Sequence, residues 1–112
     1  MGLENGIGKN KNRGRLEIVK DVLSIAVARV KKTRIMYQAN LSYKLLTRYL
    51  TEIRKACLIR FEHGERCYVL TSKGKEFLEK YTEYSKRNRH VERQLNDVHT
   101  KRKVLEKLCS SS

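Results

Sequence analysis

The sequence predicts a mainly α-helical protein in which three helices, a β-hairpin and a long C-terminal helix follow one another. Three observations predict this fold. Residues 33–57 read as two helices joined by a tight turn, and residues 58–70 hold two β-rich stretches around a glycine. From Phe77 to Cys109, residues suited to a coiled-coil core recur in alternating steps of four and three. With 112 residues, we expect one small domain over 15–72 and an appended helix over 73–109.

The first predicted helix covers residues 15–29 and supports the core. Its apolar residues lie on one stripe, while Glu17, Lys20 and Asp21 face outward. Residues 1–14, which include Arg13, are rich in glycine, asparagine and basic residues and cannot form a core, so we predict a disordered basic arm. An arm that touches nucleic acid and a solvated tail are both open. The stripe consists of Leu16, Val19, Val22, Leu23, Ala26, Val27 and Val30.

A short helix capped by Thr33 comes next and is expected to end near Asn40, because asparagine tolerates the left-handed conformation. Ser42 then offers an N-cap hydroxyl for a longer helix. That helix has a buried face, predicted to hold Leu46, Tyr49, Leu50, Ile53 and Cys57. Its opposite face carries Tyr43, Lys44, Thr47, Arg48, Thr51 and Lys55.

The polar face of this longer helix mixes long cations with hydroxyls, as a helix in a DNA groove requires. Cations hold phosphate, Arg or Lys reads guanine edges, and Ser or Thr adapts to several bases. An ordinary solvated basic face is the alternative, but the preceding short helix at helix-turn-helix spacing favours a recognition helix. Cations at the start of the short helix can meet phosphate together with free backbone N–H groups. The candidate DNA-binding residues here are Lys31, Lys32, Arg34, Ser42, Tyr43, Lys44, Thr47 and Arg48.

The stretches 58–62 and 66–70 are rich in β-branched and aromatic residues and predict a hairpin around His63-Gly64-Glu65. We expect Gly64 to take the positive φ of the turn. A hairpin directly after a helix-turn-helix forms a wing, whose tip brings His63 and Arg66 to the DNA backbone or minor groove. A single histidine at a turn is more often only solvated, which is the alternative for His63.

The last predicted helix, capped by Thr71 or Ser72, extends over some 36 residues, about 54 Å. A domain of this size cannot cover its apolar seam along the full length, so we expect a second copy of the chain to do so. The seam and predicted dimer interface comprise Phe77, Tyr81, Tyr84, Asn88, Val91, Leu95, Val98, Arg102, Leu105 and Cys109.

The direction of the predicted coiled coil depends on its core. A parallel dimer stacks Arg102 on its own copy, whereas one antiparallel register pairs Arg102 with Tyr84 as a cation–π contact. Flanking charges favour the parallel form, but exposed pairs contribute only about 0.2–1 kcal/mol each. We therefore predict an antiparallel dimer. Its two domains join the rod about 60 Å apart, farther than the roughly 34 Å between adjacent half-sites on straight DNA.

The composition restricts the partners. Twenty-six Lys and Arg against 12 Asp and Glu give a net charge of +14, which favours a polyanion, with nucleic acid as the leading candidate. No stretch is long and apolar enough to span a bilayer or to form a signal peptide, so we expect a cytoplasmic, nucleoid-associated protein.

The three cysteines and three histidines do not have the spacing of a zinc site, and Cys57 and Cys67 are interpreted as small buried hydrophobic residues. No set of catalytic residues is recognisable, so we expect no enzyme, cofactor, metal or small-molecule substrate.

The segments KKTRIMYQANLSYKLLTRYL and, after the hairpin, YVLTSKGKEFL resemble the small archaeal winged-helix DNA-binding proteins, in particular the crenarchaeal chromatin proteins that dimerise through an antiparallel coiled coil. The resemblance covers residues 15 to about 109, and LTxKGxxFL supports the fold more than the function. It implies a non-enzymatic, architectural DNA-binding dimer that bends, bridges or compacts duplex DNA. It transfers the recognition role to Tyr43, Lys44, Thr47 and Arg48, and the wing role to residues 63–66.

Three alternatives stay open at this point. One is a sequence-specific winged-helix regulator, although few side chains suited to base discrimination project from the predicted recognition helix. Another is RNA as the partner, because charge alone does not distinguish the two polymers. The third is a protein-interaction module whose wing binds an acidic partner.

Overall fold

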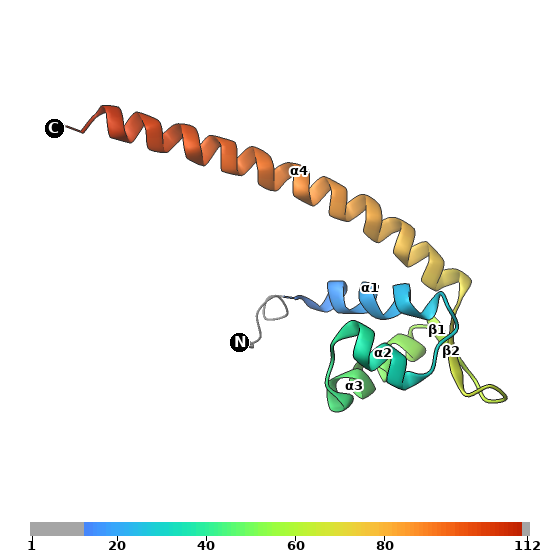
Figure 1. Ribbon diagram of the computed structural model, residues 1–112. Helices are drawn as coiled ribbons and strands as arrows, with labels where there is room; N and C mark the ends of the chain where they lie inside the picture. The colour runs from blue at the N-terminus through green and yellow to red at the C-terminus, as the bar shows by residue number, and fades with distance from the viewer. Residues whose placement is uncertain (1–12, 111–112) are drawn as a thin grey trace. The chain divides into compact units, whose positions relative to one another are not determined.

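The computed structural model describes residues 13–110 (Figure 1), so most of the predicted N-terminal arm lies outside the described residues. The chain divides into a compact unit up to Glu79 and a helical unit from Lys80 onward. The elements are helices α1 (Arg15–Ala26), α2 (Lys32–Ala39) and α3 (Tyr43–Lys55), strands β1 (Ile59–Glu62) and β2 (Cys67–Leu70), and helix α4 (Ser72–Leu108). The predicted mainly helical fold, with a two-stranded wing and a long C-terminal helix, is confirmed.

The core of the compact unit is apolar and receives side chains from all three short helices and both strands. Its largest fully buried side chains are Leu23, Ile35, Leu46, Ile53 and Ile59. Two residues of α4, Phe77 and Leu78, are half-buried and pack against the same core. The first two turns of α4 therefore stabilise the winged unit, whereas the predicted domain boundary fell at residue 72.

Two residues of the predicted core stripe of α1 are exposed. Val27 is exposed because α1 ends at Ala26 and Val27 lies in the following turn, where helical phase no longer applies. Leu16 in the first turn is also exposed, while Ile18 is buried. After this turn Arg29 takes a left-handed conformation, with φ 58°.

Helix α2 begins two residues earlier than predicted. Its N-cap is Lys31 and not Thr33, and no side chain caps it. The cause lies upstream, where Val30 and Tyr68 of β2 form an isolated β-bridge with hydrogen bonds of 2.8 and 3.3 Å. This bridge holds the chain extended up to Lys31, so the helix starts at Lys32.

Helices α2 and α3 both end in a left-handed residue. Asn40 has φ 56°, as predicted, and Leu41 N–H reaches back to the Met36 carbonyl oxygen at 3.1 Å. At the end of α3 the same arrangement uses Cys57, with φ 64°, and Leu58 N–H donates to the Ile53 oxygen at 3.1 Å. Such a terminal bond closes a Schellman motif. The prediction that Cys57 is buried is wrong, because this conformation takes it out of the helical phase and leaves it exposed.

The wing is an antiparallel pair in which Ile59 lies opposite Leu70 and Glu62 opposite Cys67. Its turn does not use Gly64 as predicted, since the left-handed residue is Arg66, with φ 56°. Longer hairpin loops often turn through right-handed residues and close with a left-handed one just before the second strand. Arg66 occupies that closing position.

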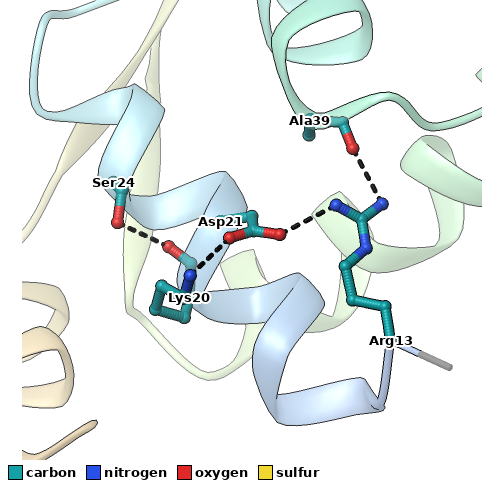
Figure 2. A network of polar contacts seen from close by, with 5 residues as sticks. All are labelled: Arg13, Lys20, Asp21, Ser24 and Ala39. Atoms are coloured by element: carbon teal, nitrogen blue, oxygen red, sulfur yellow. Dashed lines mark hydrogen bonds and ion pairs between the residues drawn. The ribbon is translucent and has the colours of Figure 1, made fainter. Parts of the chain in front are cut away.

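Arg13 ties the start of α1 to the end of α2 (Figure 2). Its guanidinium pairs with Asp21 Oδ2 at 2.8 Å and donates to the Ala39 carbonyl oxygen at 2.8 Å, with its side chain 11% exposed. Lys20 pairs with the other Asp21 oxygen at 2.7 Å. A cation at a helix C-terminus compensates the partial negative charge of the last carbonyls. Arg13 is thus anchored to the folded unit, although the prediction assigned it to the arm, and Asp21 is half-buried instead of outward-facing.

We expect Arg13→Ala to lower the free energy of unfolding by about 1–3 kcal/mol, because Asp21 and the Ala39 carbonyl lose their buried partner. Its neighbour Arg15 provides the control. Arg15 also forms an ion pair, with Glu52 at 2.7 Å, but both side chains are exposed, so Arg15→Ala should change stability by less than ~0.5 kcal/mol. Urea unfolding of both variants checks this. Equal losses would show that Arg13 has no special structural role.

Thr71 joins the end of α3 to the start of α4. Its hydroxyl donates to the Cys57 carbonyl oxygen at 2.7 Å and accepts from Gly74 N–H at 3.0 Å, so Thr71 is the cap that the sequence offered beside Ser72. Lys73 Nζ adds a bond to the Ala56 oxygen at 2.8 Å. These contacts fix the start of α4 against the end of α3 within the compact unit.

From Tyr84 onward, the predicted seam residues of α4 are exposed in the single chain. Leu95 and Val98 are each 63% exposed and Leu105 is 64% exposed. The ends of the predicted seam differ from expectation. Phe77 packs against the winged core, and Cys109 lies past the end of α4 at Leu108.

Candidate nucleic-acid interface

Lys32 at the start of α2 lies against the exposed face of α3. Its Nζ is 3.9 Å from the centroid of the Tyr43 ring and donates to Thr47 Oγ1 at 2.7 Å. The turn that Asn40 and Ser42 create brings α2 and α3 into this contact, with Ser42 Oγ accepting from Leu45 N–H at 3.1 Å. Three residues predicted separately from the sequence thus form one cationic–aromatic cluster.

The threonine hydroxyls of α3 are already committed as donors. Thr47 Oγ1 donates to the Tyr43 carbonyl oxygen at 2.8 Å, and Thr51 Oγ1 donates to the Thr47 oxygen at 2.9 Å. Lys44 and Arg48, four residues apart on the same helix, are exposed, and neither forms an ion pair within residues 13–110. Because residues at this spacing are neighbours on a helix, α3 presents two adjacent unneutralised cations beside the Lys32 cluster.

The start of α2 offers a second place for phosphate. A shallow pocket there is lined by Ala28, Arg29, Val30, Lys31, Thr33 and Arg34. The first turn of any helix carries backbone N–H groups that the helix itself does not use. Lys31 and Arg34 are exposed beside them, whereas Lys32 turns away to α3. Two of the three predicted cations therefore remain at this helix end.

The wing tip carries one unneutralised cation in the described chain. His63 packs edge-on against Phe61, with ring centroids 4.9 Å apart, so it is part of the wing's own packing. Glu65 pairs with Arg29 at 3.2 Å, and this hydrogen bond and charge raise the pKa of Arg29 above its ordinary value. Arg66 is exposed and has no such partner. The contact of Arg29 with the wing had no sequence signal, because it depends on the left-handed turn after α1.

A metal-ligand cluster and a membrane-spanning helix are both absent from the described chain. Residues 13–110 contain no cluster of three or more His, Cys, Asp or Glu side chains placed to hold a metal ion. Over the same residues, none of the helices combines the length and apolar character that a bilayer crossing requires. Of the cysteines, Cys67 is buried while Cys57 and Cys109 are exposed thiols.

The arrangement of α2, α3 and a two-stranded wing agrees with a comparison to known families, in which a model described as winged helix-turn-helix matches residues 12–89. The chain belongs to the winged helix-turn-helix family. The match spans the compact unit and the first part of α4, including every residue of the candidate interface. No curated protein matches the chain.

Among solved structures, this winged helix-turn-helix chain is similar to Sso10a-2, described as a DNA-binding protein from Sulfolobus solfataricus. The TM-score is 0.58 and the sequence identity is 24%, with 89% of this chain and 100% of that chain covered. At this identity the likeness concerns the fold. It covers more of the chain than the family match does.

Proposed function

We propose that this winged-helix protein binds duplex DNA with the exposed face of α3 in the major groove. The observation that carries the proposal is the adjacent pair Lys44 and Arg48, both exposed and unneutralised beside the Lys32–Tyr43–Thr47 cluster. The net charge of +14 and the cations at the start of α2 and at Arg66 add phosphate contacts. That the similar solved structure is a DNA-binding protein supports the same assignment.

We propose further that the protein acts as a homodimer through α4. The exposed apolar side chains from Tyr84 to Leu105 need a partner, and a second copy with the same seam is the simplest. The antiparallel register pairs Tyr84 with Arg102, Asn88 with Val98, and Val91 with Leu95. Within one helix, Lys101 pairs with Asp97 at 2.8 Å and Arg102 with Glu106 at 3.5 Å. The flanking charges that favour a parallel dimer include Lys101 of one chain facing Glu106 of the other. Because both side chains already pair within their own helix, that contact between chains supports the parallel form less.

An architectural role suits the interface better than sequence-specific regulation. The hydroxyls of Thr47 and Thr51 donate hydrogen bonds to the helix backbone, so toward bases they can act only as acceptors.

The distance between the two winged units of the dimer supports this architectural role less than the sequence suggested. Since the winged unit extends to Glu79, about 14 residues from the centre of the antiparallel register, its two copies join the rod about 42 Å apart. Low base discrimination, more than spacing, therefore supports bending, bridging or compaction.

The proposed role is non-enzymatic, and we place the protein with the nucleoid in the cytoplasm. Neither a cofactor nor a small-molecule substrate belongs to this proposal. RNA is the competing polyanion, and the two differ in groove geometry, since the deep, narrow major groove of A-form RNA does not admit a helix such as α3. A gel-shift comparison of duplex DNA, single-stranded DNA and duplex RNA tests the choice. Equal affinity for duplex RNA would contradict a groove-reading α3.

Salt dependence tests whether the cations contact phosphate. If a dimer neutralises about 6–10 phosphates, its affinity for duplex DNA should fall roughly 10³–10⁵-fold between 50 and 200 mM salt. Fluorescence anisotropy with random and selected duplexes measures this. A nearly salt-independent affinity would contradict the proposal. A large preference for one sequence that persists at high salt would instead favour the regulator.

Single substitutions test the assignment to α3. Arg48→Ala should weaken binding about ten-fold, roughly the 1–3 kcal/mol of one good arginine contact, because Arg48 has no partner in the chain. The matched control is Arg15→Ala, which removes the same charge from α1, where Arg15 already pairs with Glu52. If both variants lose equal affinity, α3 is not the recognition helix.

A further inference from the structure

The face of α4 opposite its apolar seam carries a continuous polar stripe, which we call the outer stripe. Its members follow one another in alternating steps of three and four, which keeps them on one side of a helix. All are exposed, and all lie within the unit that begins at Lys80. The outer stripe consists of Lys86, Arg89, Arg93, Asn96, Thr100, Lys103 and Lys107.

No acidic residue falls on the outer stripe. From Lys80 onward the sequence has four acidic residues, Glu83, Glu92, Asp97 and Glu106, and all lie at other helical positions. Two of them are engaged with cations that flank or belong to the seam, since Asp97 pairs with Lys101 and Glu106 with Arg102. Within the described chain, none of the five cations of the outer stripe has an ion-pair partner. The helix thus neutralises charge beside the seam and leaves it unneutralised on the opposite face.

We propose that the outer stripe is a second DNA-contact surface, which binds the phosphate backbone of a duplex independently of the winged unit. From Lys86 to Lys107 it is about 32 Å long at the rise of an α-helix, close to the roughly 34 Å of one DNA turn. Five cations can pair with phosphates, and the Asn96 amide and Thr100 hydroxyl between them can donate to phosphate oxygens. Because a coiled coil covers only the seam, the outer stripe stays accessible in the proposed dimer.

Duplex DNA fits this surface better than an anionic membrane does. A helix that lies on a membrane needs a wide, unbroken apolar face opposite its cations. On α4 that opposite face is the narrow seam, interrupted by Asn88 and by the ion-paired Arg102. Nothing apolar occurs on the outer stripe itself. The outer stripe instead presents cations at both ends and hydrogen-bond donors between them, all of which can contact the phosphates of a duplex.

The test compares two triple variants of the full chain that each remove three positive charges from α4. The stripe variant is Lys86→Gln/Arg89→Gln/Arg93→Gln. The control is Lys80→Gln/Arg87→Gln/Lys101→Gln, which removes three cations that lie outside the outer stripe. Circular dichroism and sedimentation first establish equal helicity and oligomeric state. The affinity for a duplex of about 40 base pairs is then measured against salt.

We expect the stripe variant to bind at least ~10-fold more weakly than the control, and its salt slope to fall by about 2–3, roughly 0.9 for each phosphate that is no longer neutralised. Equal affinities and slopes would overturn the proposal. So would stripe-dependent binding to phosphatidylserine vesicles without stripe-dependent binding to DNA.

The same comparison in a Lys44→Ala/Arg48→Ala background separates this inference from the proposed function. There the residual DNA binding should depend on the outer stripe and should still be salt-sensitive. If Lys44→Ala/Arg48→Ala alone leaves affinity unchanged, the α3 interface is wrong, whereas the outer stripe is judged only by the difference between its variant and the control.

Discussion

A chain carrying Leu95→Lys and Val98→Lys should sediment as a monomer at concentrations at which the unchanged chain is a dimer. Both side chains are 63% exposed in the single chain, and the proposed antiparallel register would bury them beside Val91 and Asn88 of the partner. Each dimer would then have to bury four ammonium groups without counter-charges, which costs far more than the apolar contacts contribute. We expect the dissociation constant to rise by at least ~10³-fold, equivalent to about 4 kcal/mol.

The matched control adds the same two lysines on the other side of the helix. Asn96→Lys and Thr100→Lys lie on the outer stripe, opposite the seam, and should leave the dimer intact. Sedimentation equilibrium of both variants checks the prediction. A Leu95→Lys/Val98→Lys chain that remains dimeric would show that α4 is not the dimer interface. If it is monomeric, tethered-DNA measurements should also show that it binds without bridging.

The thiol of Cys109 reports the direction of the coiled coil. A parallel dimer holds the two Cys109 residues together, whereas an antiparallel dimer places them at opposite ends, so mild oxidation should not cross-link them. Because Cys57 is also exposed, the experiment requires a Cys57→Ser background. Rapid Cys109 cross-linking within the dimer would contradict the antiparallel register.

Gly74→Ala should strongly destabilise the winged unit. Gly74 is buried, and a Cβ at this position would collide with the Leu58 carbonyl oxygen and approach Leu70 Cδ1 to 2.6 Å. A backbone oxygen cannot move aside as a flexible side chain can, so we expect the free energy of unfolding to fall by roughly 1–3 kcal/mol, toward the upper end of that range. Loss of the Thr71 cap, whose hydroxyl accepts from Gly74 N–H, would add to the effect.

Gly64→Ala is the control for this prediction. Gly64 is exposed at the wing tip, lies outside the left-handed region, and has nothing within 4 Å of the added Cβ. Its substitution should change stability by less than ~0.5 kcal/mol. Thermal or urea unfolding of the two variants measures the difference. Equal stabilities would mean that α4 can shift away from Leu58 at little cost.

The order and type of the elements could be predicted from the residues alone, because each element has a local cause. Ser42 caps α3 and Asn40 ends α2 in the left-handed region, and both residues favour these positions through their own side chains. The spacing of Leu46, Leu50 and Ile53 fixed the buried face of α3, which left Lys44 and Arg48 on the outside. The positive charge likewise follows from composition alone.

Features that depend on contacts between residues far apart in the chain could not be predicted in this way. The bridge between Val30 and Tyr68 sets the start of α2, and the Arg13 contacts with Asp21 and Ala39 join α1 to α2. Phe77 has the spacing of a seam residue, yet its side chain packs against the core of the winged unit. Helical periodicity predicts which face of a helix is apolar, but it does not predict what covers that face. For the same reason the pairing of Lys32 with Tyr43 and Thr47 could not be read from their positions in the chain. The sequence supplied the charges, and folding decided which of them are neutralised.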